Sequence, residues 1–252
     1  MTAPEPALRQ ALIETCRALR DRGLTFGTSG NVSVRCGEGF LISPTGVDYG
    51  ALLPEELPYV EWSGTWFGPK QPSSEWRFHR DILRARTEIN AVVHTHSTHA
   101  TALACRGQGI PAFHYMVAVA GGVDIRCAPY ATYGTQALSD AALIALDSRR
   151  ACLLGNHGVI ALGQHLSAAL GLAGEVENLA QQYLLSLLGG TPRLLDAAEM
   201  LHVVEKFKNY GQGRPSSPDD PGGHDGHDGQ PGAELRFGGV TRRLDTPGPP
   251  DR

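Results

Sequence analysis

The chain has 252 residues, of which 41% are hydrophobic and 19% charged, and this composition suits a globular protein with a sizeable core. Its formal net charge is -4 and its pI about 6.2, so there is no basic field to attract nucleic acid. No apolar run approaches the length of a membrane span, and the N-terminus lacks the layout of a signal peptide. The five cysteines are scattered without CxxC spacing, which favours reduced thiols and a cytoplasmic location over a disulfide framework.

The first half of the chain alternates between helix and strand patterns. Apolar residues recur at helical spacing over residues 7–22, and Gly23 ends this predicted helix. The stretch NVSVRCGEGFLIS predicts two short strands around a Gly-Glu-Gly turn. We expect a second helix to begin near the serines of PSSEWRFHRDILRARTE, and INAVVHTH to follow it as a buried strand.

The second half continues in the same mixed manner. TQALSDAALIALDSR predicts a helix, and ACLLGNHGVIALG predicts a strand, a glycine-bounded turn and another strand. Residues 167–188 form a long predicted helix, and AAEMLHVVEKFKNYG predicts a last helix that ends at Gly211. The chain has no GxGxxG motif and no regular βαβ period. We therefore predict an α/β fold in which helices cover both faces of a central, mainly antiparallel sheet.

The composition changes sharply at Gly211. From there to the last residue the chain has 10 Gly and 7 Pro in 42 residues, with the repeat HDGHDG in the middle. Such a segment offers too little apolar surface to offset the entropy of ordering it. We therefore predict one folded domain within residues 1–210 and a disordered tail over residues 211–252.

The stretch AVVHTHSTHA places three histidines close together after an apolar run. On a strand, residues two apart project from the same face, so His94 and His96 point together while Thr95 points outward on the other face. Two imidazoles side by side form half of a zinc site. His99 lies past the expected strand end and is predicted to be a supporting or structural group.

A third histidine ligand is suggested by the turn GNHG. His157 lies between Gly155 and Gly158, whose conformational freedom suits a side chain aimed into a cleft, although a solvent-exposed turn histidine remains the alternative. Three histidines leave one position open around a tetrahedral metal, which is typical of a catalytic site. We expect the other folded-domain histidines to be structural or surface groups: His79, His114, His165 and His202.

A carboxylate and two hydroxyls precede the second predicted helix. Glu75 is expected in the first helical turn, where acidic residues also occur simply because they favour the helix dipole. Ser73 and Ser74, with the free N–H groups of the helix entrance, could hold a phosphate or an oxyanion. Beside a metal, Glu75 could act as a general acid and base. The glycine-bearing loops GTSGNVSV and SPTGVDYG do not match a Walker A motif, so nucleotide binding is not expected.

Motifs along the chain resemble those of the class II aldolase/adducin family, and most closely its L-fuculose-phosphate aldolases. In order, they are GTSGNVSVR, LISPTG, PSSEWRFH, AVVHTHSTH, IPAFHYMVAVAGG, APYATYGT, LLGNHG and EKFKNYG. The resemblance spans about residues 8–210. It implies a three-layer α/β/α domain, assembled as a fourfold-symmetric homotetramer with active sites shared between subunits.

The resemblance also implies roles for individual residues. His94, His96 and His157 match the ligands of one Zn²⁺ per subunit, or of another divalent metal, and Glu75 matches an acid/base that also coordinates the resting metal. Tyr115 matches a tyrosine that reaches a neighbouring subunit's site and handles the aldehyde-side proton. Phosphate-binding loops match Gly30, Asn31, Thr45, Gly46, Ser73 and Ser74. Tyr133 and Tyr210 match aromatic positions at the aldehyde end. In the family members that the chain most resembles, phenylalanine occupies the position of Tyr133.

The function implied is zinc-dependent cleavage of a ketose 1-phosphate, L-fuculose 1-phosphate or a close relative, to dihydroxyacetone phosphate and a short aldehyde such as L-lactaldehyde. The expected partner is thus a phosphorylated sugar, without nucleic acid or membrane. Alternatives on the same scaffold are a 5-deoxyribulose 1-phosphate aldolase, a methylthioribulose 1-phosphate dehydratase, a tetronate-phosphate decarboxylase and a ribulose-phosphate 4-epimerase. The epimerases have aspartate where this chain has Glu75, and the non-catalytic adducin heads lack the metal ligands, so both are disfavoured.

Overall fold

A computed structural model of the protein describes residues 5–208. Tyr210 and the predicted tail over residues 211–252 lie outside the described residues. The division into a folded domain and a disordered tail therefore stays a prediction.

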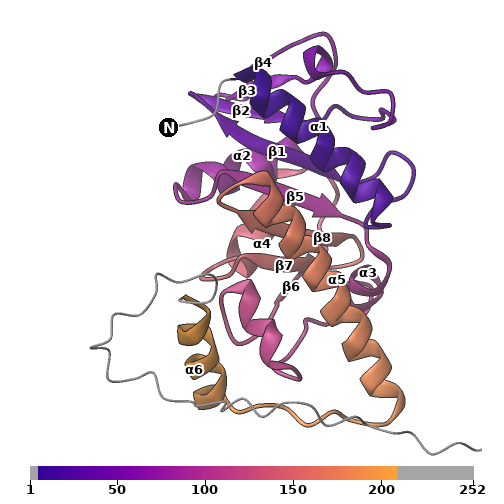
Figure 1. Cartoon of the computed structure of the whole chain (residues 1–252), viewed down its shortest axis with the longest axis vertical. Helices are drawn as coiled ribbons and strands as arrows, with labels where there is room; N and C mark the ends of the chain where they lie inside the picture. The colour runs from indigo at the N-terminus through magenta and orange to yellow at the C-terminus, as the bar shows by residue number, and fades with distance from the viewer. Residues whose placement is uncertain (1–4, 209–252) are drawn as a thin grey trace, which may run out of the picture. The chain divides into compact units, whose positions relative to one another are not determined.

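The centre of the domain is one eight-stranded sheet with the order β4-β3-β2-β1-β5-β8-β7-β6 (Figure 1). Every neighbouring pair is antiparallel except β6 and β7, which confirms the predicted mainly antiparallel sheet. The strands are β1 (Asn31–Cys36), β2 (Gly39–Ile42), β3 (Tyr59–Glu61), β4 (Trp66–Phe67), β5 (Ala91–Thr95), β6 (Cys127–Ala128), β7 (Ala151–Leu154) and β8 (Gly158–Gly163).

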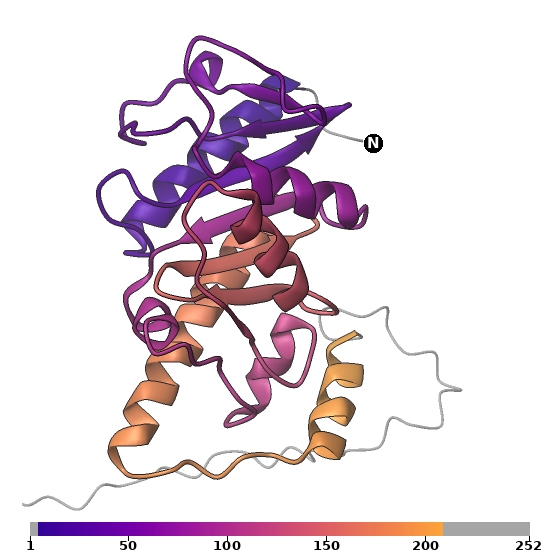
Figure 2. The same ribbon diagram turned by 180° about the vertical axis from the view of Figure 1, so that it is seen from behind.

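Helices cover both faces of this sheet, as predicted. On one face lie α1 (Glu5–Asp21) and α5 (Leu166–Leu188), and on the other lie α2 (Trp76–Ala85) and α4 (Gln136–Ala145) (Figures 1 and 2). Each helical layer encloses its own buried apolar cluster against the sheet. The remaining helical elements are α3 (Thr98–Ala104), α6 (Ala197–Lys208) and the 3₁₀ helices η1 (Pro54–Glu56) and η2 (Tyr115–Ala120).

Strand β5 lies in the middle of the sheet, between β1 and β8, and all of its residues are buried. Val93 packs in the cluster under α1 and α5, whereas Val92 packs in the cluster under α2 and α4. By the same alternation His94 faces the α2 layer, where its ring lies edge-on to Phe78. Thr95 points the opposite way, as predicted, but it is completely buried rather than solvent-facing. Helices on both sides leave no face of this strand open to water.

Gly158 begins β8 directly after His157, and its position predicts a stability effect. A Cβ added there would overlap the carbonyl oxygen of Thr95 on β5, so the two central strands would have to separate. We expect Gly158→Ala to lower the free energy of unfolding by about 1–3 kcal/mol, the usual range for overpacking. Urea denaturation followed by circular dichroism measures this change.

Gly171 on α5 provides the matched control, because a Cβ there meets nothing within 4 Å. Gly171→Ala is expected to raise the free energy of unfolding by roughly 0.5–1 kcal/mol, since alanine favours the helical backbone. Equal effects of the two substitutions would contradict the predicted overlap between a Cβ at position 158 and the carbonyl oxygen of Thr95.

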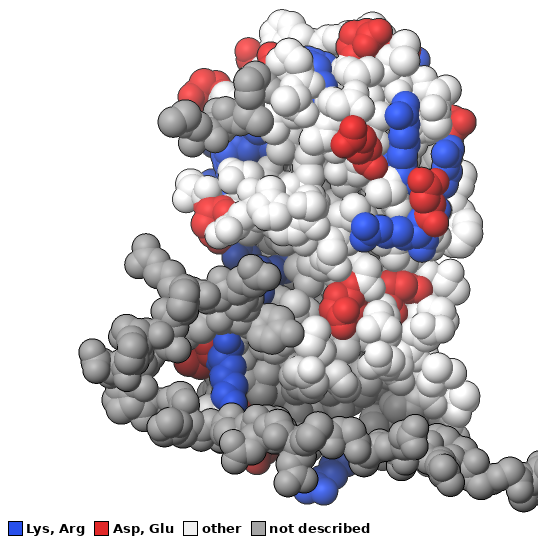
Figure 3. Space-filling model, viewed as in Figure 1, with Lys and Arg blue, Asp and Glu red and all other residues white. Residues whose placement is uncertain are grey.

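The surface charges and the state of the cysteines agree with what the composition predicts. Basic and acidic side chains are interspersed on the face shown in Figure 3. Within residues 5–208 no helix is both long and apolar enough to cross a membrane. All five cysteines are free, and burial raises the pKa of the Cys16 and Cys152 thiols.

Candidate metal centre

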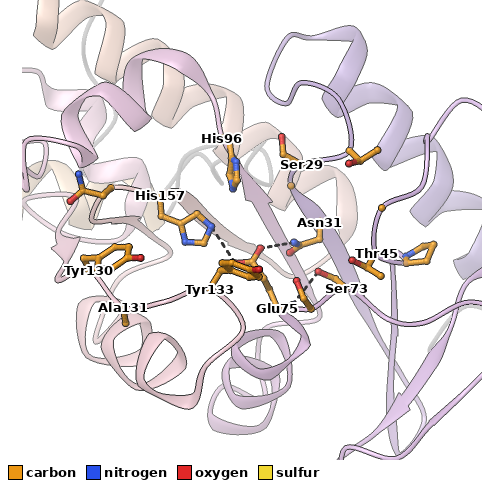
Figure 4. Close-up of a pocket in the computed structure, with 16 residues that line it drawn as sticks. Ser29, Asn31, Thr45, Ser73, Glu75, His96, Tyr130, Ala131, Tyr133 and His157 are labelled. Carbon is orange, nitrogen blue, oxygen red and sulfur yellow. Dashed lines mark hydrogen bonds and ion pairs between the residues drawn. The ribbon is translucent and has the colours of Figure 1, made fainter.

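Four potential metal ligands converge at one end of the central strands. The ligand atoms of Glu75, His94, His96 and His157 all lie within 4.8 Å of one another. His94 is on β5, His96 follows that strand immediately, and His157 is in the turn between β7 and β8. Because β5 and β8 are antiparallel neighbours, the start of β8 lies beside the end of β5 and brings His157 to the histidine pair. Figure 4 shows His96, His157 and Glu75 around the same space.

The distances within the cluster fit a single divalent ion. His94 Nε2 lies 3.0 Å from His96 Nε2 and 3.2 Å from Glu75 Oε2. His157 Nε2 lies 3.2 Å from Glu75 Oε1. Four ligand atoms at zinc bond lengths in a tetrahedron are separated by roughly 3.3 Å. The side chains are therefore already spaced as such a site requires.

The protonation of the cluster also suits a cation. His94 Nδ1 lies 2.8 Å from the carbonyl oxygen of Val159, which can only accept, so Nδ1 carries a proton and Nε2 is the nitrogen left to bind a cation. Glu75 Oε1 is buried and accepts no well-formed hydrogen bond from the described residues. A buried carboxylate oxygen left in this state requires a positive partner, and a divalent ion between the four side chains would provide it.

The pKa values of the cluster follow from burial and mutual charge. Burial alone raises the pKa of Glu75, but the attraction of His94 and the close polar contacts with His157 and His94 outweigh it, and the net pKa lies well below the usual range. Burial, followed by the repulsion of His94 and His157, lowers the pKa of His96 to about 4. At neutral pH Glu75 is therefore ionised and His96 neutral, and these are the forms that bind a metal.

A cavity of about 320 Å³ opens beside the cluster. Its wall includes Glu75, His96 and His157, and His94 lies fully buried behind it. The same wall contains seven residues predicted to bind the substrate: Gly30, Asn31, Thr45, Gly46, Ser73, Ser74 and Tyr133. The two glycine-bearing loops, the entrance of α2 and the candidate metal-binding cluster therefore surround one space (Figure 4).

Local geometry explains why small residues occur in these loops. Gly30 and Gly46 have φ values of +78° and +65°, which side chains rarely adopt, and a Cβ on Gly30 would lie 2.9 Å from the carbonyl oxygen of His94. Glu75 is the residue before α2 and not part of its first turn, in contrast to the prediction. Ser73 accepts two backbone N–H groups at this point, that of Glu75 at its hydroxyl (3.3 Å) and that of Trp76 at its carbonyl (3.1 Å).

Of the predicted site residues that the structure describes, Tyr115 lies outside the cavity wall. Tyr115 begins η2 and is 51% exposed, with its ring stacked on those of His114 and Phe207. His99 donates from Nδ1 and from its backbone N–H to Glu177 on α5, so it fastens the start of α3 as a structural group. Tyr210 lies beyond the described residues.

Several residues near the site were not singled out by the sequence. The cavity wall also contains Thr28, Ser29, Pro44, Tyr130, Ala131 and Asn156. Tyr130 belongs to the same APYATYGT motif as Tyr133, and Asn156, in the GNHG turn, has a φ of +53°, which is unusual for a residue other than glycine. Both residues lie in motifs that the sequence already contains, but their position in a motif indicates no chemistry by itself.

The remaining described histidines are mostly structural. His114 and His165 accept backbone N–H groups at the starts of η2 and α5, and His202 is exposed on α6. His79 is fully buried and contacts Asn31 and Ser33. Burial, followed by repulsion from His94, lowers the pKa of His79 to about 3 and keeps it neutral.

Comparison with known proteins gives the same assignment for most of the chain. Residues 10–184 match the family model described as the class II aldolase and adducin N-terminal domain. A 5-methylthioribulose-1-phosphate/5-deoxyribulose-1-phosphate aldolase of Rhodospirillum rubrum is 53% identical over 214 residues, which cover 84% of this chain and 97% of that protein.

An L-fuculose phosphate aldolase of Escherichia coli K12 is 47% identical over 205 residues, covering 81% of this chain and 95% of that protein. A solved L-fuculose 1-phosphate aldolase superposes with a TM-score of 0.78 at 40% identity, covering 82% of this chain and 98% of that one. These similarities confirm the resemblance read from the motifs: the chain belongs to the class II aldolase and adducin family.

Proposed function

We propose that this class II aldolase uses zinc to cleave 5-deoxyribulose 1-phosphate or 5-methylthioribulose 1-phosphate between C3 and C4. The products are dihydroxyacetone phosphate and a short aldehyde, acetaldehyde or its methylthio derivative. The observation that carries the proposal is the buried cluster of three histidines and Glu75 beside a cavity lined by the two glycine-bearing loops. Identity to the Rhodospirillum relative, 53% against 47% for the L-fuculose phosphate aldolase, favours these substrates over the L-fuculose 1-phosphate expected from the sequence.

The cavity can hold the two ends of such a substrate apart. Thr45, Gly46, Ser73 and Ser74 lie on loops that present hydroxyl and backbone N–H groups, which suits the phosphate. Tyr130, Ala131 and Tyr133 form another part of the wall and suit the aldehyde end, which is apolar in both proposed substrates. A methyl or methylthio group needs such an apolar contact, whereas the lactaldehyde portion of L-fuculose 1-phosphate carries a further hydroxyl.

The reaction needs stabilisation of negative charge and controlled proton transfer. A divalent ion held by His94, His96 and His157 would supply Lewis-acid stabilisation to the oxygens of the ketose. In the condensation direction, the ionised Glu75 carboxylate removes a proton from the hydroxymethyl carbon of dihydroxyacetone phosphate. In the cleavage direction the same carboxyl returns that proton to C3 after the C3–C4 bond has broken.

The proton on the C4 hydroxyl requires a second group. Tyr115 is the proposed group, and it would act from a neighbouring subunit, because within one subunit it lies on the surface away from the cavity. The half-exposed ring at the start of η2 leaves Tyr115 available to a neighbouring subunit, as the homotetramer with shared active sites implied by the family resemblance requires. This assembly, and a cytoplasmic location, remain part of the proposal.

A panel of ketose phosphates tests the function directly. Zinc-loaded protein is incubated with 5-deoxyribulose 1-phosphate, 5-methylthioribulose 1-phosphate and L-fuculose 1-phosphate, and release of dihydroxyacetone phosphate is followed by a coupled NADH assay. We expect kcat/KM for the first two to exceed that for L-fuculose 1-phosphate by roughly tenfold or more, as one added polar group in an apolar pocket allows. The opposite ranking would return the assignment to L-fuculose 1-phosphate, and no dihydroxyacetone phosphate from any substrate would contradict the aldolase.

A further inference from the structure

Behind the metal centre, a chain of hydrogen bonds runs through the buried layer between the sheet and α2. Asn31 Nδ2 donates to Glu75 Oε2 at 2.8 Å, and the Asn31 amide oxygen contacts His79 Nε2. On the other side of the imidazole ring, His79 Nδ1 lies 2.7 Å from Ser33 Oγ. Ser33 and His79 are fully buried, so solvent does not replace the contact between them, whereas Asn31 and Glu75 border the cavity.

The direction of each hydrogen bond is set from the carboxylate end. An ionised Glu75 can only accept, so Asn31 must turn its NH₂ group toward it and its carbonyl oxygen toward His79. His79 Nε2 must then carry a hydrogen in order to donate to that oxygen. In neutral imidazole the other nitrogen accepts, so the Ser33 hydroxyl donates to Nδ1. This is the one arrangement in which every contact in the chain joins a donor to an acceptor.

The backbone places Asn31 between two side chains of one segment. Glu75 immediately precedes α2, and His79 lies four residues later, so both project from the same side of the helix. Asn31 lies opposite them on β1, where it pairs in register with His94 of β5. Its amide is therefore held at both ends, by Glu75 at the nitrogen and by His79 at the oxygen.

Removing the donor on His79 would leave the amide of Asn31 held by Glu75 alone, with its buried carbonyl oxygen unpaired. Because an unpaired buried oxygen is costly, the amide would turn or shift toward another donor. Either movement takes Nδ2 away from Glu75 Oε2, and the carboxylate would lose the contact that fixes it beside the metal-binding histidines.

We propose that His79 is a positioning residue that acts through Asn31 to hold the Glu75 carboxylate in place for proton transfer. The proposal rests on the proposed aldolase function, in which Glu75 moves the proton at C3. His79 itself does not line the cavity and touches no substrate.

Two substitutions of similar polarity test whether His79 positions Asn31 or only fills space in the core. In His79→Gln the side-chain NH₂ falls near the position of Nε2 and can still donate to Asn31, whereas in His79→Asn it falls near Nδ1 and reaches only toward Ser33. We expect His79→Asn to lower kcat by about 10–100-fold, the usual effect of losing a partner that orients an active-site group, with KM nearly unchanged. His79→Gln is expected to retain most of the wild-type kcat.

A double-mutant cycle with Asn31→Ala shows whether the two residues act as one unit. If His79 acts through Asn31, the double variant with His79→Asn has the same kcat as Asn31→Ala alone. A purely structural His79 would lower thermal stability in both His79 variants and would give losses of kcat that multiply in the double variant. Multiplying losses would overturn the proposal.

Crystal structures of the two His79 variants provide a readout that does not depend on the reaction. We expect the contact between Asn31 Nδ2 and Glu75 Oε2 to persist in His79→Gln and to be lost in His79→Asn. An unchanged contact in folded His79→Asn overturns the positioning role even if the wild-type protein cleaves none of the proposed substrates. If His79→Asn does not fold, His79→Gln decides alone, and a tenfold loss of kcat in that variant overturns the proposal.

Discussion

Replacing Glu75 with glutamine is expected to lower kcat by about 10²–10⁴-fold, the range associated with a positioned general acid or base. Glutamine has nearly the same shape, so it fills the same space beside Asn31 and the histidines, but it can neither take up nor release the proton at C3. Steady-state kinetics on the best ketose phosphate, together with the zinc content of each preparation, measures the effect.

Asp81→Asn is the matched control for this experiment. Asp81 lies on α2, the helix that Glu75 precedes, and its carboxylate is largely buried and accepts hydrogen bonds from Ser139 and Gln136. The same change from carboxylate to amide there should leave kcat close to that of the wild type. Normal turnover by Glu75→Gln at unchanged metal content would show that the proton is carried by another group.

Removing the metal is expected to abolish turnover, with a loss of roughly a hundredfold or more. The buried oxygen of Glu75 and the inward lone pair of His94 then have no cation between them. Dialysis against a chelator followed by addition of Zn²⁺ should remove and restore activity. His157→Ala is expected to give the same loss together with a fall in bound zinc, which elemental analysis measures.

His99→Ala is the control for the histidine substitution. His99 lies only three residues from His96 in the sequence, but its side chain contacts Glu177 on α5 and not the cluster. We expect this variant to keep its bound zinc and its activity. Full activity of metal-free protein, or loss of zinc in His99→Ala, would contradict the assignment of the ligands.

The longer elements of the fold could be predicted because each carries its own periodic pattern. The helices α1 and α5 and the hairpin of β7 and β8 lie within a few residues of their predicted bounds. Shorter elements had no such pattern: β4 and β6 have two residues each, and they are strands because neighbouring strands supply the hydrogen bonds. The helix α3 was also missed, because the residues after His96 were predicted only to lie past the end of a strand and no helix was assigned to them.

The site was predictable only in part from local rules. The two-residue spacing of His94 and His96 predicts that they point together, although β5 already ends at Thr95. That His157 joins them depends on the pairing of β5 with β8, which are more than 60 residues apart and which no local pattern specifies. The motifs of the family supplied this long-range information. They did not indicate the contacts of Asn31 with His79, because that pairing depends on how α2 packs over β1.

Metal binding is linked to folding because the ligands come from separate parts of the domain. The four side chains come from the entrance of α2, the end of β5 and the turn before β8, and an unfolded chain would not hold them together. Any ion bound by all four is therefore bound only by the assembled domain, and mass action shifts the equilibrium toward it by about 2.7 kcal/mol when the free ion is at a hundred times its dissociation constant. The supply of the divalent ion would then affect the stability of the fold as well as the activity.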